Sequence, residues 1–188
     1  MRKRLTELFA YMDETRAALI ATAGDINPAV AMIRPRGACW SAAEVVAHLA
    51  IVEQIVARMV SSAIAKAREE GIGGDESDDS IMSSLDRFRV TEVVKKITAP
   101  PTTTPDDNTP VPESLTVMTV ARARLRDTLS AASELDLKSI KRPNPLLGEL
   151  DMYQWGLFVA QHEERHRRQI ERTLSEVTEL AAESAPMV

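Results

Sequence analysis

Apolar residues at helical spacing fill most of this sequence, and they limit its fold more than any other feature. The clearest run starts at Ser41, because a serine with a glutamate three residues later (Glu44) forms the capping box that often begins a helix. An apolar stripe that contains a histidine follows: Val45, His48, Leu49, Val52, Ile55, Val56, Met59 and Val60. The stripe predicts a long helix that ends by Gly71.

Three further stretches show the same period, and none alternates as a half-buried strand does. We therefore predict long helices over Leu5–Ala23, Glu113–Leu135 and Leu150–Leu180. The segment Pro28–Trp40 is expected to be a loop with a turn of helix. Together these elements predict an all-α four-helix bundle that forms a single domain over residues 1–188.

The segment 71–112 separates the second and third long helices. Residues 71–80 are rich in Gly, Asp and Ser and are expected to form an exposed loop, whereas Ile81–Ile97 could be a shorter helix. Five prolines between 98 and 112 exclude a regular helix there. A proline-rich loop of this length in a small domain indicates a functional cover or an insertion. A second loop is predicted over Lys141–Pro145.

Composition and charge narrow the classes of partner. The net charge of −5 argues against a nucleic-acid binder, because phosphate neutralisation needs a basic face. No apolar run approaches the roughly 20 residues that cross a bilayer, and the charged start lacks a signal-peptide core, so we expect a cytoplasmic protein that does not enter membranes. The single cysteine, Cys39, fits a reducing compartment and shows no sign of thiolate activation.

The three histidines carry the clearest chemical signal. His162 and His166 are four residues apart, a spacing that puts both imidazoles on one helix face with Cβ atoms about 5–6 Å apart. His48 lies within the apolar stripe of the second long helix. If the two stripes face each other, three imidazoles meet and leave an open position for a divalent metal. The alternative is three core histidines with satisfied hydrogen bonds, in a metal-free interaction module.

Several polar neighbours have a structural and a functional interpretation. Glu44 is expected to cap its helix, and Glu53 to lie on a solvated face, although either could orient an imidazole. Glu163 could be a ligand or a base, but it begins a run of charges typical of a solvated face. Gln169 could reach the histidines or bond between helices.

Two motifs resemble the signatures of the DinB/YfiT-like superfamily. The first, similar to W-S-x-x-E-v-x-x-H-L-x-x-x-E, is Trp40-Ser-Ala-Ala-Glu-Val-Val-Ala-His48-Leu-Ala-Ile-Val-Glu53. The second, similar to H-x-x-x-H-x-x-Q-I, is Gln161-His-Glu-Glu-Arg-His-Arg-Arg-Gln-Ile170. The resemblance implies a bundle of up-down-down-up topology, a divalent metal held by His48, His162 and His166, and a homodimer. The long proline-rich segment 71–112 departs from a minimal member.

The resemblance also implies three classes of function. Some members transfer low-molecular-weight thiols such as bacillithiol or mycothiol, so we expect a metal-dependent transferase that joins a thiol to an electrophile. Metal-dependent hydrolysis is the second possibility, and a non-catalytic metal-binding or stress-response protein is the third. Imidazole ligands suit zinc, nickel and iron, and the sequence does not choose among them.

Overall fold

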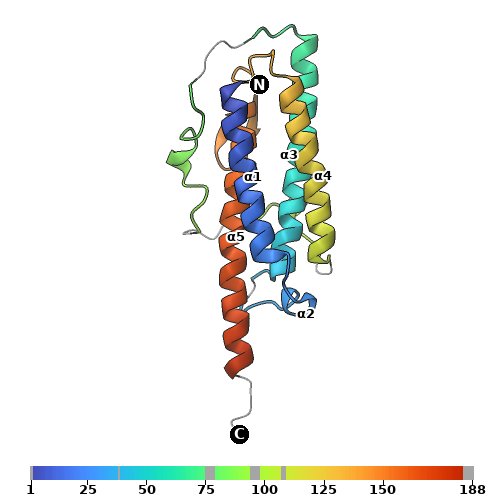
Figure 1. Cartoon of the computed structure of the whole chain (residues 1–188), viewed down its shortest axis with the longest axis vertical. Coiled ribbons are helices and arrows are strands. Elements are labelled where there is room, and N and C mark those ends of the chain that lie inside the picture. The colour runs from blue at the N-terminus through green and yellow to red at the C-terminus, as the bar shows by residue number, and fades with distance from the viewer. Residues whose placement is uncertain (1, 38, 75–78, 94–97, 107–108, 184–188) are drawn as a thin grey trace.

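Four long helices form a bundle in the computed structural model, which describes residues 2–37, 39–74, 79–93, 98–106 and 109–183 (Figure 1). Their bounds are close to those predicted: α1 Lys3–Ala23, α3 Ala42–Glu69, α4 Val111–Ala131 and α5 Met152–Glu183. The expected turn of helix in the first connection is α2, Pro28–Ala31. The all-α four-helix bundle is therefore confirmed.

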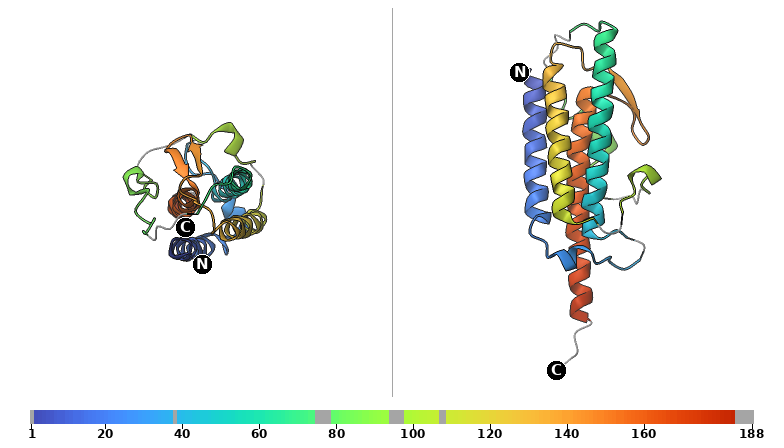
Figure 2. Two further views of the ribbon diagram at one scale, coloured as in Figure 1. Left: turned by 90° about the horizontal axis from the view of Figure 1, so that it is seen from above. Right: turned by 90° about the vertical axis from the view of Figure 1, so that its right-hand side faces the viewer.

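The helices follow the up-down-down-up order. α1 and α5 run in one direction, and α3 and α4 run in the other (Figure 1). The long connection between α3 and α4 returns the chain to the end of the bundle where α3 begins, which makes these two helices parallel. The C-terminal part of α5 projects beyond the other helices (Figure 2).

The predicted capping box begins α3. The Ser41 hydroxyl accepts a hydrogen bond from the Glu44 amide at 3.2 Å, and the Glu44 carboxylate accepts one from the Ser41 amide at 2.8 Å. By length and composition α3 could cross a membrane, with a mean hydropathy of 1.4 over its most apolar 18-residue window. Its apolar side packs against the other helices, and 56% of that window is buried, as in the core helix of a bundle.

The segment between α3 and α4 differs from the prediction. A helix over Ile81–Ile97 is absent from its described part, where only one 3-10 turn forms, η1 Asp86–Phe88. That turn ends at Arg89, whose φ of 52° is left-handed and stops propagation. Residues 94–97 lie outside the described residues. A second 3-10 turn, η2 Pro101–Thr103, lies in the proline-rich part.

A β-hairpin precedes α5 where the sequence predicted only a loop. Strands β1 Lys141–Asn144 and β2 Gly148–Asp151 pair antiparallel, with Asn144 opposite Gly148. The strands are too short to show alternation, and Pro143 hides the pattern further. Gly148 has a φ of +79°, which glycine adopts without strain.

The buried apolar side chains form two clusters along the bundle. The larger contains the first half of α1, the second half of α3 and the start of α5, with Met12, Val56, Leu125 and Ala160 among its members. The smaller contains Leu19, Leu49, Met118 and Ile170 from the same four helices. The two clusters therefore succeed one another along the bundle axis.

Candidate metal centre

His48, His162 and His166 meet where α3 faces α5. One ring nitrogen from each lies within 4.8 Å of the other two. The ring centre of His48 is 5.3 Å from that of His162 and 5.0 Å from that of His166. His48 and His166 are buried, whereas His162 is partly exposed. The predicted facing of the two stripes is thus present in the structure.

Hydrogen bonds orient two of the rings. His48 Nδ1 lies 2.7 Å from the Thr103 carbonyl oxygen, which can only accept, so Nδ1 is the protonated nitrogen of a neutral ring. His166 Nδ1 lies 2.8 Å from Gln169 Oε1, which also accepts. Both imidazoles therefore keep the Nε2 lone pair free for another partner. Such outer bonds fix the tautomer of histidines that ligate metals.

The donor set fits a divalent metal. His166 Nε2 lies 3.0 Å from His162 Nε2. Nitrogen ligands at about 2.0–2.1 Å from a tetrahedral zinc lie about 3.3 Å apart, so the observed spacing is close to that of two ligands on one ion. Three imidazole nitrogens leave a fourth position, which is the composition of many catalytic sites.

Burial keeps the three rings neutral. It lowers the pKa of His48 and, with the proximity of His166 and His48, holds the pKa of His162 well below its ordinary value. Burial likewise lowers the pKa of His166 to about 3, and the nearby His48 acts in the same direction. Neutral imidazole is the form that ligates metals, so no proton has to leave these rings near neutral pH.

Aromatic side chains pack against the histidines on two sides. The Trp40 ring lies with its centre 4.9 Å from that of His48, and the Phe158 ring stacks on His162 with centres 5.2 Å apart. Apolar walls of this kind limit solvent access and strengthen electrostatic interactions inside a site.

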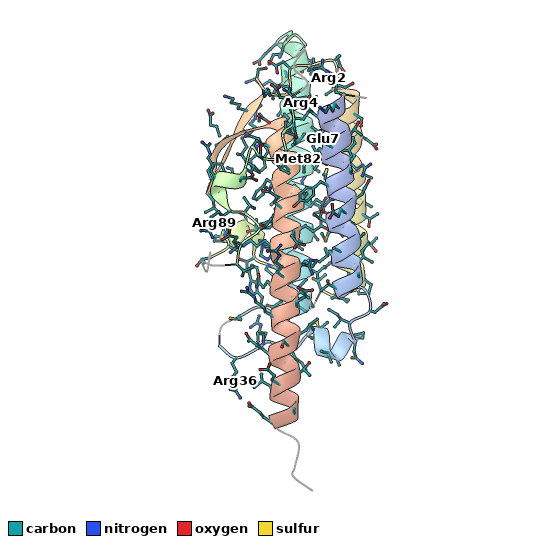
Figure 3. The ribbon with its side chains drawn as sticks, turned by 60° about the vertical axis from the view of Figure 1, so that its left-hand side comes forward. Arg2, Arg4, Glu7, Arg36, Met82 and Arg89 are labelled. Atoms are coloured by element: carbon teal, nitrogen blue, oxygen red, sulfur yellow. The ribbon has the colours of Figure 1, made fainter. Side chains whose placement is uncertain are left out.

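The long connection between α3 and α4 also reaches this region. Figure 2 shows its 81–93 part beside α5 and its 98–104 part beside α3. Arg165 Nη1 donates to the Glu92 carbonyl, and Arg172 donates to the Val93 carbonyl at 3.4 Å. Met82 and Arg89 belong to the part that runs along α5 (Figure 3). With the Thr103 contact to His48, the connection is attached on both sides of the histidines.

Comparison with known proteins decides the family. The model of the DinB superfamily matches residues 11–170. This chain belongs to the DinB superfamily. Its fold is also similar to a crystal structure of TT2238, a four-helix bundle protein, with 21% identity and a TM-score of 0.57. That match covers 89% of this chain and 98% of the other. No match was found among curated proteins.

Two of the acidic residues in this DinB protein lie where the sequence did not predict them. Glu53 and Glu163 were expected on solvated faces, and that expectation is wrong, because they are only 2% and 1% exposed. Both pair with Arg16 and Arg122, which supply the charge that a buried carboxylate needs.

The structure also places the other residues that were considered from the sequence. Glu44 caps α3 as predicted and also accepts two hydrogen bonds from the Arg34 guanidinium. Gln169 reaches the site rather than bonding between helices. Cys39 is exposed and free.

Three contributors around the DinB histidines were not predicted from the sequence. The Thr103 carbonyl belongs to the backbone, so no side-chain pattern signals it. Arg16 and Arg122 do carry a signal, because each occupies a position of an apolar stripe: Arg16 between Met12 and Leu19, and Arg122 between Met118 and Leu125.

Proposed function

We propose that this DinB protein binds one divalent metal ion through Nε2 of His48, His162 and His166. The observation that carries the proposal is the approach of the three ring nitrogens to within 4.8 Å. Acceptors for Nδ1 of His48 and His166 support it, because they leave the inner nitrogens without protons. The neutral state of all three rings supports it further.

The metal-free alternative requires a different tautomer of His162. A histidine of a core needs partners for both nitrogens or a place where one nitrogen meets solvent. Here the inner nitrogens of His162 and His166 lie 3.0 Å apart, so without a metal His162 Nε2 would carry a proton and donate it to His166 Nε2, whose lone pair is free. Zinc, nickel or iron would accept both lone pairs, and imidazole suits all three metals.

We further propose a metal-dependent enzyme that transfers a low-molecular-weight thiol to an electrophile. A divalent metal in this position would act as a Lewis acid and hold a thiol deprotonated near neutral pH. The chain supplies the rest: the partly exposed His162 leaves a way in, and Trp40 and Phe158 exclude water from two sides. Metal-dependent hydrolysis and non-catalytic metal binding or stress response are the alternatives.

The remaining proposals concern partners and compartment. We propose a homodimer in the cytoplasm that binds neither nucleic acid nor membrane. The net charge of −5 argues against nucleic acid, and the free Cys39 fits the reducing compartment. Exposed apolar side chains support the dimer: Ile20, near the end of α1, is 48% exposed, and Met32 and Ile33, which directly follow α2, are 37% and 46% exposed. Analytical ultracentrifugation would test it.

Metal analysis of protein without a histidine tag tests the central proposal. We expect about one equivalent of zinc, nickel or iron by mass spectrometry, or uptake of zinc by the metal-free protein. The His162→Ala variant should lose it. The matched control is Glu171→Ala, an exposed residue on the same helix that should bind as the wild type does. A wild-type protein that neither carries nor takes up metal would contradict the proposal.

Activity assays separate the enzyme from the binder. The metal-loaded protein would be incubated with cysteine or bacillithiol and a generic electrophile such as monochlorobimane, and thioether formation followed. Metal-dependent turnover that the His48→Ala variant lacks would support thiol transfer. Binding of metal without turnover of thiols or of ester substrates would favour the non-catalytic alternative.

A further inference from the structure

Four charged side chains, one from each long helix, form a closed ring inside the bundle. We call them the charged quartet: Arg16 on α1, Glu53 on α3, Arg122 on α4 and Glu163 on α5. Arg16 donates from Nη2 to Glu53 at 2.6 Å and from Nε to Glu163 at 2.7 Å. Arg122 donates from Nε to Glu53 and from Nη2 to Glu163. Each of the four carboxylate oxygens therefore accepts one guanidinium hydrogen bond.

The quartet lies where the two apolar clusters meet. On α1 it falls between Met12 of the larger cluster and Leu19 of the smaller one. On α3 the order is reversed, with Leu49 before Glu53 and Val56 after it. The same boundary recurs on α4 and α5. All four side chains are at most 12% exposed.

A buried ring of this kind contributes little net stability but demands a strict geometry. The cost of removing four charges from water offsets most of their attraction, so apolar replacements are often neutral or stabilising. The hydrogen bonds, in contrast, tolerate little sliding, because one residue of helical rise is about 1.5 Å. The best attested role of such buried polar groups is to fix register. Here the register concerns all four helices.

The register that matters most for the histidines is that of α3 against α5. His48 belongs to α3, whereas His162 and His166 belong to α5, so the distance between the two parts of the site is a distance between these helices. Glu163 directly follows His162 in the chain. Both arginines bridge Glu53 to Glu163, and therefore α3 to α5.

The quartet and the histidines are also neighbours in space. One small gap between α3, α4 and α5 is lined by Glu53, Glu163 and His162 together, with Leu49, Val52, Met118 and Val159 around them. A shift of α5 that broke the bond between Arg16 and Glu163 would move His162 by the same amount.

We propose that the charged quartet positions the histidine site, because it fixes the register of α3 against α5 and so keeps His48 within ligand distance of His162 and His166. This inference rests on the proposed metal binding. The four side chains act through the helices and do not touch the metal.

The decisive variant replaces the whole quartet by apolar side chains of similar size, Arg16→Met, Glu53→Leu, Arg122→Met and Glu163→Leu. Cobalt(II) is the probe, because its visible absorption reports ligand geometry. We expect a folded protein with an unchanged or higher Tm, cobalt affinity at least about 10-fold weaker, and altered cobalt bands, since losing groups that orient ligands costs about 10–100-fold in metal affinity. A purely structural role would not change the cobalt spectrum of a folded protein.

A matched control removes another ion pair between helices. Arg126 pairs with Asp13 and so joins α4 to α1 at the surface. The variant Arg126→Met with Asp13→Leu should bind cobalt with the wild-type affinity and spectrum.

A second variant decides the question if the first does not fold. Arg16→Met with Glu53→Gln leaves the net charge unchanged and keeps the bonds of Arg122 to Glu163 and to the amide oxygen introduced at position 53. We expect it to fold and to bind cobalt with an affinity between those of the wild type and the complete replacement, which would be partial rescue.

The outcomes separate the two proposals. If the wild type binds no cobalt, the proposed metal site fails. If the wild type binds cobalt and the folded variants match its affinity and spectrum, the positioning role is overturned while the metal site stands.

Discussion

His166 Nε2 lies 3.0 Å from His162 Nε2, one helical turn apart on α5. A proton on both nitrogens would place two donors against each other and would make His166 positive, because its Nδ1 also donates, to Gln169. Burial is the main cause that lowers the pKa of each ring, and the proximity of the other histidines adds to it. This pair is therefore poised to stay neutral, and two consequences can be measured.

The first is acid sensitivity of the metal-free protein. The unfolded histidines bind protons below a pKa of about 6.5, whereas the folded rings stay neutral, with His166 at about 3. The unfolded state thus binds more protons in this window. The free energy of unfolding is highest above pH 6.5 and should fall as pH falls, by about 1 kcal/mol between pH 6.5 and 5.5 for each ring that stays neutral. Urea unfolding at pH 7.5, 6.5 and 5.5 measures the slope.

The variant His166→Gln serves as the control for acid sensitivity. It removes one of the titrating rings and should reduce the loss of stability between pH 6.5 and 5.5 by about 1 kcal/mol. A wild-type stability that stays level or rises between pH 7.5 and 5.5 would show that the rings are not held neutral.

The second consequence concerns Gln169, whose Oε1 accepts from His166 Nδ1 at 2.8 Å. Gln169→Leu leaves that nitrogen without an acceptor and frees the ring to rotate. Zinc affinity, measured by competition with a chelator, should fall about 10–100-fold, with little change in Tm. Gln169→Glu keeps an acceptor and should retain the wild-type affinity or exceed it. Equal zinc affinities of the Leu and Glu variants would show that Gln169 does not orient the His166 ring.

The proline-rich connection gives a third prediction. Thr103 offers its carbonyl to His48 from a 3-10 turn that Pro100 and Pro101 begin. Pro100→Gly with Pro101→Gly loosens this turn, because glycine has many more backbone states to lose. We expect zinc affinity to fall several-fold while the far-ultraviolet circular dichroism of the bundle is unchanged. Pro145→Gly, in the exposed hairpin turn, is the matched control and should leave affinity unchanged.

The sequence predicted the helices and the convergence of the histidines because both depend on periodicity. The stripe through His48 and the spacing of His162 and His166 determine which faces are apolar, and burial then brings those faces together. The sequence did not predict the hairpin or the 3-10 turns, since these depend on a few backbone angles such as those of Arg89 and Gly148.

The charged quartet shows a different limit. Glu163 begins a run of charges, and such runs usually face solvent. Its position in the stripe of Val159 and Ile170 pointed the other way. The quartet nevertheless occupies stripe positions on all four helices, with two positive and two negative charges. Periodicity does not predict how these charges pair, because the ion pairs depend on the axial position of each helix in the bundle.

The last prediction separates the stability of α3 from the site that it carries. Ser41 is 1% exposed, and its hydroxyl accepts from the Glu44 amide. Ser41→Ala removes that bond and should lower the free energy of unfolding by about 1 kcal/mol. Glu44 keeps its bonds to the backbone amide of residue 41 and to Arg34, so the helix start and His48 should stay in place. Urea unfolding should therefore show the loss while zinc affinity stays unchanged, and a parallel loss of affinity would mean that the start of α3 also positions His48.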